Sequence, residues 1–190
     1  MQQVGRRAVM LSAAWSHGGC WGTLPAMADA SPTSIDTSRG DRHPATTSLG
    51  LVERVAALHR VDLFAGVPGR VLAAVAEAAT EVEAAPGDVL IEEGTVEAHL
   101  FAVVRGRVRV HRGGRTLVEL GPCTTVGELA ALVPQPRTAS VTTLEPTLAL
   151  RLDKAVLDDL LADWPELAHG VIEALVARLG AIAEHADRAR

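Results

Sequence analysis

The sequence is poor in the residues that build several common kinds of site. Among its 190 residues are two cysteines, no tyrosine, five other aromatic side chains and a single lysine, Lys154. Cys20 and Cys123 are too few for a disulfide framework, and no pair of cysteines or histidines has the spacing of zinc ligands. No run of eighteen apolar residues occurs, so we expect no membrane span and a cytoplasmic location.

The short motifs of the common enzyme classes are also missing. There is no G-x-S-x-G elbow, no H-E-x-x-H, no Walker loop and no G-x-G-x-x-G after a strand. We therefore expect no enzyme, no metal and no cofactor. The formal net charge of −5 argues against binding to a nucleic-acid backbone. Arg105, Arg107 and Arg109 alternate along a predicted strand, which favours a solvated face over a nucleic-acid surface.

What is present is the composition of one ordinary globular domain, with 48% hydrophobic and 22% charged residues. Near-helical spacing of apolar residues predicts helices over 51–66 and 68–80. The period then changes to two, which predicts strands over 103–110, 116–120 and 141–152. A helical period returns over 154–184, interrupted at Trp164, and Pro165 fits the first turn of a second helix. The pattern indicates a small antiparallel barrel or sandwich with flanking helices.

The ends of the chain are expected to lie outside this domain. We divide the sequence into an N-terminal extension (1–48), a folded domain (49–186) and a short tail (187–190). The extension has no sustained period, and we interpret it as a disordered tail or a misassigned start. The alternative is a twin-arginine export signal, because Arg6 and Arg7 precede an apolar segment and a small-residue Ala26-Met27-Ala28 site.

The most informative segment runs from Gly127 to Val141, and we call it the cassette. A glycine opens a short apolar helical turn, whose backbone N–H groups can take a phosphate. Arg137 presents the fork that grips a phosphate through two hydrogen bonds, and a hydroxyl follows it. Glu128 beside a phosphate is repulsive unless it accepts from a neutral donor such as a ribose hydroxyl. Sugar and phosphate on one small ligand indicate a nucleotide.

The cassette resembles that of the cyclic nucleotide-binding domains, as in catabolite activator protein and protein kinase A regulatory subunits. The order Gly-Glu-Leu-Ala…Pro-Arg-Thr-Ala-Ser-Val matches the kinase form without a gap. Gly94 and Gly106 match the two turn glycines of the family, and Ala139 matches the small residue after the arginine. The resemblance extends from about Leu51 to about Leu179.

This resemblance implies a fold and a function. The fold is mainly β, an antiparallel β-roll or jelly-roll barrel with N-terminal helices and a C-terminal hinge or lid helix. The ligand is cyclic AMP, favoured over cyclic GMP, and its binding moves the C-terminal helix. The partners are an unknown effector and a second copy joined through that helix, without nucleic acid or membrane. The implied ligand-binding residues are Gly127, Glu128, Leu129, Ala130, Arg137, Thr138, Ala139 and Ser140.

Three departures keep an alternative open, namely an interaction scaffold of the same fold that binds no ligand. The stretch from Cys123 to Val126 replaces the usual glycine, acid and aromatic before the cassette. Pro134 and Pro136 stiffen its middle, and no aromatic residue follows Trp164 to stack on a base. If the ligand is bound, we expect Arg137 to be engaged only by its phosphate, so that Arg137→Ala leaves the melting temperature unchanged.

Overall fold

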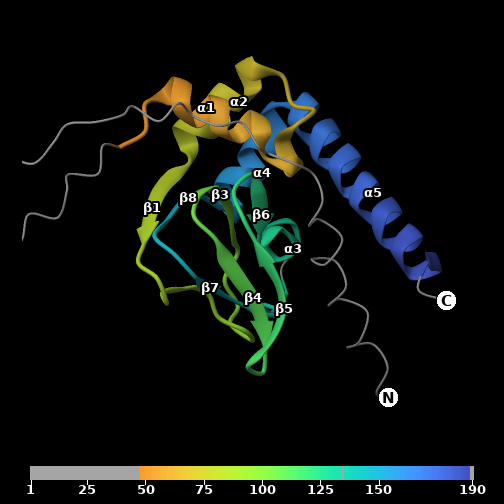
Figure 1. Cartoon of the computed structure of the whole chain (residues 1–190). Helices are drawn as coiled ribbons and strands as arrows, with labels where there is room; N and C mark the ends of the chain where they lie inside the picture. The colour runs from red at the N-terminus through yellow and green to blue at the C-terminus, as the bar shows by residue number, and fades with distance from the viewer. Residues whose placement is uncertain (1–47, 134, 189–190) are drawn as a thin grey trace, which may run out of the picture.

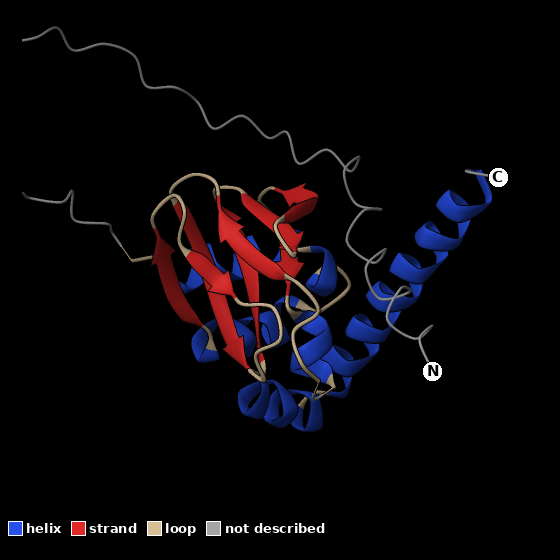
Figure 2. Ribbon diagram, turned by 90° about the horizontal axis from the view of Figure 1, so that it is seen from below, coloured by secondary structure: helices blue, strands red, loops and turns tan. Residues whose placement is uncertain are grey.

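The computed structural model describes residues 48–133 and 135–188, with α5 side chains described only to Gly180 and at Glu184. Two four-stranded antiparallel sheets lie face to face, and helices gather at one end of them (Figures 1 and 2). The predicted fold, antiparallel β with flanking helices and a long C-terminal helix, is confirmed. The expectations about the N-terminal extension, the export signal and Cys20 lie outside the described residues.

One sheet has the strand order β1-β8-β3-β6 and the other has the order β2-β7-β4-β5. The strands are β1 (Thr80–Ala84), β2 (Val89–Ile91), β3 (His99–Arg105), β4 (Val108–Arg112), β5 (Arg115–Leu120), β6 (Thr124–Val126), β7 (Ser140–Thr143) and β8 (Thr147–Asp153). In β4, Val108 and Val110 are buried between the sheets while Arg107 before them is exposed, as the alternation predicts. The inner faces close on an apolar cluster that includes Phe101, Val103 and Val141.

The helices form a second layer with its own apolar core. They are α1 (Leu51–Arg60), the 3-10 turn η2 (Asp62–Phe64), α2 (Gly69–Ala78), α3 (Glu128–Leu132), α4 (Lys154–Asp163) and α5 (Pro165–Arg188). Phe64 and Leu72 from the N-terminal helices pack with Leu157 and Leu167 from the C-terminal ones. Pro165 opens α5, as its fixed φ predicts. Figure 1 shows α5 leaving this layer and pointing away from the barrel toward its C-terminal end.

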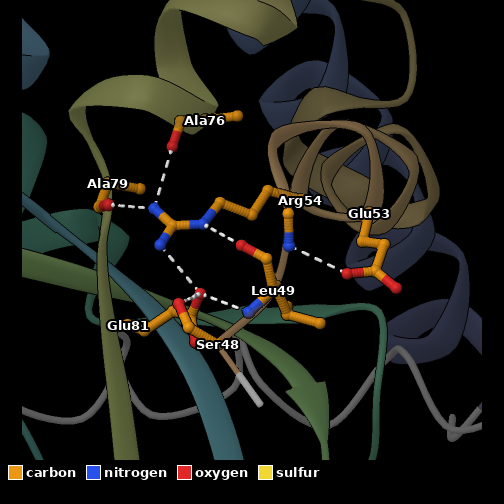
Figure 3. A network of polar contacts seen from close by, with 8 residues as sticks. Ser48, Leu49, Glu53, Arg54, Ala76, Ala79 and Glu81 are labelled. Atoms are coloured by element: carbon orange, nitrogen blue, oxygen red, sulfur yellow. Dashed lines mark hydrogen bonds and ion pairs between the residues drawn. The ribbon is translucent and has the colours of Figure 1, made fainter.

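A half-buried arginine, Arg54, ties the N-terminal helices to the first strand (Figure 3). Arg54 of α1 donates to the carbonyls of Ala76 and Ala79 at the end of α2, at 3.3 and 2.9 Å. It also pairs with Glu81 of β1 at 2.8 Å. A cation at a helix C-terminus satisfies carbonyls that have no partner within the helix. Ser48, the last residue of the predicted extension, donates to Glu81 as well, so this residue contacts the domain.

The helix predicted over 68–80 is too long, and the strand predicted over 141–152 is two strands. α2 ends at Ala78 because the chain turns extended at Ala79 and enters β1, which pairs with β8. β7 and β8 belong to different sheets, separated by a bend at Leu144 and Glu145. The helix predicted over 51–66 is likewise interrupted at Val61, whose backbone is extended.

Two turn glycines of the predicted motif have the backbone that requires glycine. Gly94 and Gly106 have φ of 83° and 91°. At Gly106 a Cβ would also lie 2.4 Å from Oγ1 of Thr147, so no larger residue fits without a shift. Cys123 stands where the sequence departs from the family, and it is the one described non-glycine residue with positive φ, at 68°. A left-handed cysteine costs on the order of 1 kcal/mol relative to a glycine at the same position.

Candidate ligand-binding site

The cassette connects the two sheets and forms one wall of a pocket. It leaves β6 at the edge of one sheet, makes the single helix α3 and enters β7 in the interior of the other sheet. Gly127 precedes α3 with φ of 84°. A Cβ there would lie 2.7 Å from Nη1 of Arg137 and 2.8 Å from Ile91, so only glycine lets the cassette close on its own arginine.

Arg137 is buried and held in place before any ligand is considered. Only 4% of its surface is exposed. Nη1 donates to the carbonyl of Gly127 at 3.0 Å, and Nη2 donates to the carbonyl of His99 at 2.6 Å. Two backbone hydrogen bonds join Arg137 to the Gly94 turn. The Arg137 N–H donates to the carbonyl of Thr95, and the Arg137 carbonyl accepts from the N–H of Gly94, both at 2.9 Å. The conformation of Gly94 therefore positions the arginine.

The guanidinium of Arg137 has hydrogen bonds but no ion-pair partner among the described residues. Its Nε is buried and has no hydrogen-bond partner there either. Burial lowers the pKa of Arg137, while the more distant Glu97 and Glu128 act in the opposite direction. An arginine has five N–H donors, and Arg137 uses two of them in hydrogen bonds to carbonyls. The remaining N–H donors are available to an anion. The expectation that Arg137 is engaged only by a ligand is wrong, because its guanidinium also donates to the carbonyls of Gly127 and His99.

Glu128 is also buried, and its partner comes from α5. Its Oε1 lies 2.7 Å from Nη1 of Arg178, and both side chains are about nine-tenths buried. Burial raises the pKa of Glu128, and the guanidinium of Arg178 acts against that rise. Sequence reasoning missed Arg178, which lies fifty residues away. The available signal is its position on the buried face of α5, in register with Leu167, Val171 and Leu175.

Seven of the eight predicted ligand-binding residues line one pocket. They are Gly127, Glu128, Leu129, Ala130, Arg137, Thr138 and Ala139. Arg178 lines it too, and an apolar wall completes it with Ile91, Val110, Leu117, Leu120 and Val141. Ser140 lies outside the lining, and its hydroxyl accepts from the Glu93 N–H at 3.0 Å. The carbonyl of Thr138 accepts from Arg112 at 2.7 Å, which fixes the residue after the arginine.

The pocket thus offers one cationic end, one acidic group and an apolar wall. Across the described part of the chain, no group of three His, Cys, Asp or Glu side chains is placed to hold a metal ion. Within the same ranges, no helix combines the length and apolarity of a membrane span. The arrangement suits a small ligand with one negative charge, hydroxyl donors and a flat or apolar part.

Comparison with known proteins gives consistent similarities. The family described as "Cyclic nucleotide-binding domain" matches residues 81–163. A CRP-like cAMP-activated global transcriptional regulator of Mycobacterium tuberculosis is 32% identical over 127 residues, 64% of this chain and 57% of that protein. The chain therefore spans little more than half of this curated relative.

Two solved structures are similar in fold and sequence. One is the N-terminal domain of a transcriptional regulator from Streptomyces coelicolor A3(2), with a TM-score of 0.60 and 32% identity over 68% of this chain and 93% of that one. The other is the regulatory domain of Toxoplasma gondii PKA with cAMP, with a TM-score of 0.54 and 25% identity over 58% of this chain and 44% of that one.

Proposed function

Because the chain belongs to the cyclic nucleotide-binding domain family, a family of regulatory domains, we propose that its pocket binds cyclic AMP and that binding is coupled to α5. The observation that carries this proposal is Arg137. It is a buried guanidinium without an acidic partner in the described residues, on the lining of a pocket. A buried charge is costly when unpaired, and a phosphate restores the pairing that the protein itself leaves incomplete.

The charge of the pocket favours a cyclic phosphate over a nucleoside triphosphate. Arg178 is paired with Glu128, which leaves Arg137 as the one cation on the lining without an acid. The single lysine, Lys154, pairs instead with Asp158 on α4. A cyclic phosphodiester carries one negative charge and matches one guanidinium. A triphosphate carries several, and Glu128 would add repulsion.

Each other part of the ligand has a proposed contact. The ribose 2′-hydroxyl donates to Glu128, and the first turn of α3 supplies N–H groups that lack acceptors within the helix. The apolar wall from Val110 to Leu120 receives the base. Cyclic AMP is proposed over cyclic GMP because the regulator and the bound structure described above are named for it. We further propose a binding module rather than an enzyme, working in the cytoplasm on an effector that remains to be identified.

Coupling to α5 is proposed because this helix contributes Arg178 to the pocket. Its opposite face exposes Ile172, Val176 and Leu179, each by more than half of its surface. A homodimer through this face remains a prediction, and sedimentation of the full chain tests it.

The function is tested by calorimetric titration of the full chain with cyclic AMP and cyclic GMP. AMP, with an open phosphate that carries more charge, is the control ligand. We expect saturable binding of one cyclic nucleotide per chain, with cyclic AMP the tighter and AMP at least tenfold weaker. A folded protein that binds neither cyclic nucleotide at millimolar concentration supports the scaffold alternative and refutes the proposal.

A further inference from the structure

The C-terminal part of the cassette is held by a side chain from outside it. The paired register of β4 and β7 ends at His111 and Ser140. Just beyond this pair a side chain continues the contact, because Nε of Arg112 donates to the carbonyl of Thr138 at 2.7 Å. A hydrogen bond with an ionised donor is about twice as strong as one between neutral groups. The residue after Arg137 is therefore fixed to the end of β4.

Glu93, in the turn after β2, joins the same two segments. Its backbone N–H donates to the hydroxyl of Ser140 at 3.0 Å, and its Oε2 accepts from the N–H of Gly113 at 3.0 Å in the turn between β4 and β5. Its Oε1 lies 3.7 Å from Nε of Arg112, and the two side chains are 38% and 32% exposed. An ion pair at this exposure contributes little by itself. The hydrogen bond of Arg112 is thus the main contact, and Glu93 keeps its donor beside the cassette.

Arg112 connects two parts of the pocket lining. Val110 and Leu117 of the β4–β5 hairpin line the pocket, and so does Thr138. Arg112 follows Val110 by two residues in β4, so its hydrogen bond sets the position of Thr138 relative to the apolar wall. Arg112 is not itself part of the lining. It therefore acts on a ligand through the residue that it positions.

The side chain of Thr138 is the one suited to distinguish one base from another. Two threonines line the pocket. The hydroxyl of Thr125 donates to Asp62 at 3.2 Å, whereas that of Thr138 makes no hydrogen bond within the part of the chain that the structure describes. A hydroxyl oxygen can accept from the 2-amino group of guanine, which adenine lacks. This contact requires that the backbone of Thr138 is held at the right place.

We propose that Arg112 is a positioning residue for base selectivity, since it holds the carbonyl of Thr138 and so places the Thr138 hydroxyl for the base of the ligand. The identity of the ligand rests on the proposed function. An acceptor that is fixed before binding loses less conformational freedom when the ligand arrives. Without the donor of Arg112 this advantage is lost, and it is lost only for a ligand that bonds the hydroxyl. Base selectivity then depends on a strand residue that the cassette does not contain.

Two variants separate this hydrogen bond from the rest of the Arg112 side chain. Arg112→Gln places an amide N–H at the position of the arginine Nε, whereas Arg112→Met places a methyl group there. Arg115→Ala is the matched control, because Arg115 is exposed and lies opposite Arg112 in the same hairpin. The affinity of each full-chain variant for cyclic AMP and cyclic GMP is measured by calorimetric titration.

We expect Arg112→Met to lower cyclic GMP affinity by about three- to fivefold and cyclic AMP affinity by less than about 1.5-fold, because at most one neutral hydrogen bond to the ligand is lost. Arg112→Gln and Arg115→Ala should stay within about 1.5-fold of the wild type for both ligands. In a Thr138→Ala background, Arg112→Met should change the ratio of the two affinities by less than about 1.5-fold, since no hydroxyl remains to be positioned.

Three results of these titrations overturn the inference. The first is an unchanged ratio of the two affinities in Arg112→Met, whether both ligands bind equally weaker or as well as before. The second is the same change of ratio with and without the Thr138 hydroxyl. The third is a change in Arg112→Gln as large as that in Arg112→Met, which would show that the N–H donor is not what matters.

Hydrogen exchange of the ligand-free chain supplies an independent measurement. The amides of Gly94 and Arg137 are bonded between the turn and the cassette, so they report whether the cassette is held. We expect Arg112→Met to raise their exchange at least about threefold and to leave that of β3 unchanged, whereas Arg112→Gln changes neither. Unchanged exchange of both amides in Arg112→Met overturns the inference. If the wild-type chain binds neither cyclic nucleotide, the proposed function fails and the selectivity role fails with it, while the exchange result still shows whether Arg112 holds the cassette.

Discussion

Arg137→Ala is expected to damage both the fold and the ligand site, because the side chain serves two purposes. The substitution removes the donors to the buried carbonyl of His99 and the half-buried carbonyl of Gly127. A hydrogen bond from a charged donor contributes about 1.5 to 3 kcal/mol, and a buried carbonyl left without its donor is costly. Part of this loss is offset because a buried guanidinium is itself unfavourable, as the lowered pKa of Arg137 indicates. We expect the free energy of unfolding to fall by about 2 to 4 kcal/mol.

The assay is urea unfolding of the ligand-free full chain, followed by calorimetry under conditions where the variants are folded. Arg107, an exposed arginine just before β4, provides the matched control, and Arg107→Ala should change stability by less than about 0.5 kcal/mol. Separately, Arg137→Ala should weaken the binding free energy of a cyclic nucleotide by about 2 to 3 kcal/mol, roughly a hundredfold in affinity. Arg137→Lys should recover part of the stability and little of the affinity, since an ammonium lacks the fork.

An Arg137→Ala variant whose free energy of unfolding lies within about 0.5 kcal/mol of the wild-type value would contradict this expectation. That result would mean that the two carbonyls do not depend on the guanidinium and that the arginine serves the ligand alone.

Three further predictions concern single side chains of the site. Glu128→Gln should weaken cyclic AMP binding by about 1 kcal/mol or more and 2′-deoxy cyclic AMP binding far less, and equal losses would exclude the ribose contact. Thr138→Ala should lower cyclic GMP affinity by about 1 kcal/mol and leave cyclic AMP affinity nearly unchanged, because the hydroxyl can accept from the guanine amino group. A parallel fall for both ligands would show that Thr138 supports the cassette instead. Burial, with Arg137 and Arg151 nearby, lowers the pKa of His99 against the opposing effect of Glu97 and Asp153. As the pH falls, His99 is protonated in the unfolded chain before it is protonated in the folded one. The free energy of unfolding should therefore decrease below about pH 6.5, and His99→Gln should make this decrease smaller in urea titrations.

The cassette could be predicted from the sequence because its parts are close together along the chain. Gly127, Glu128 and Arg137 lie within eleven residues, and local spacing fixes which of them face one another. The helix of α3 and the start of α5 at Pro165 follow from the same local rules. The fold class followed from the helical period over 51–80, the change to a period of two over 103–152 and the return of the helical period at 154.

Features that depend on distant partners were not predictable in this way. The segment Thr80–Ala84 alternates polar and apolar residues over only four positions, too few to predict a strand, and it becomes one because β8 pairs with it. Arg178 is invisible to motif reasoning because its partner Glu128 lies in a different element, and the only local sign is a charge on the apolar face of a helix. Arg137 was assigned to the ligand alone because spacing cannot show that the carbonyl of His99, 38 residues away, would meet it.

The place of the cassette between the two sheets has a mechanical consequence. Arg137 is joined through its backbone to the turn after β2 in one sheet and through its side chain to β3 in the other. A ligand that binds this side chain therefore stabilises the position of the two sheets relative to each other, because both sheets are bonded to the same arginine. Hydrogen exchange should then slow in both sheets together when the pocket is filled, and slowing confined to the cassette would show that the sheets are not mechanically joined there.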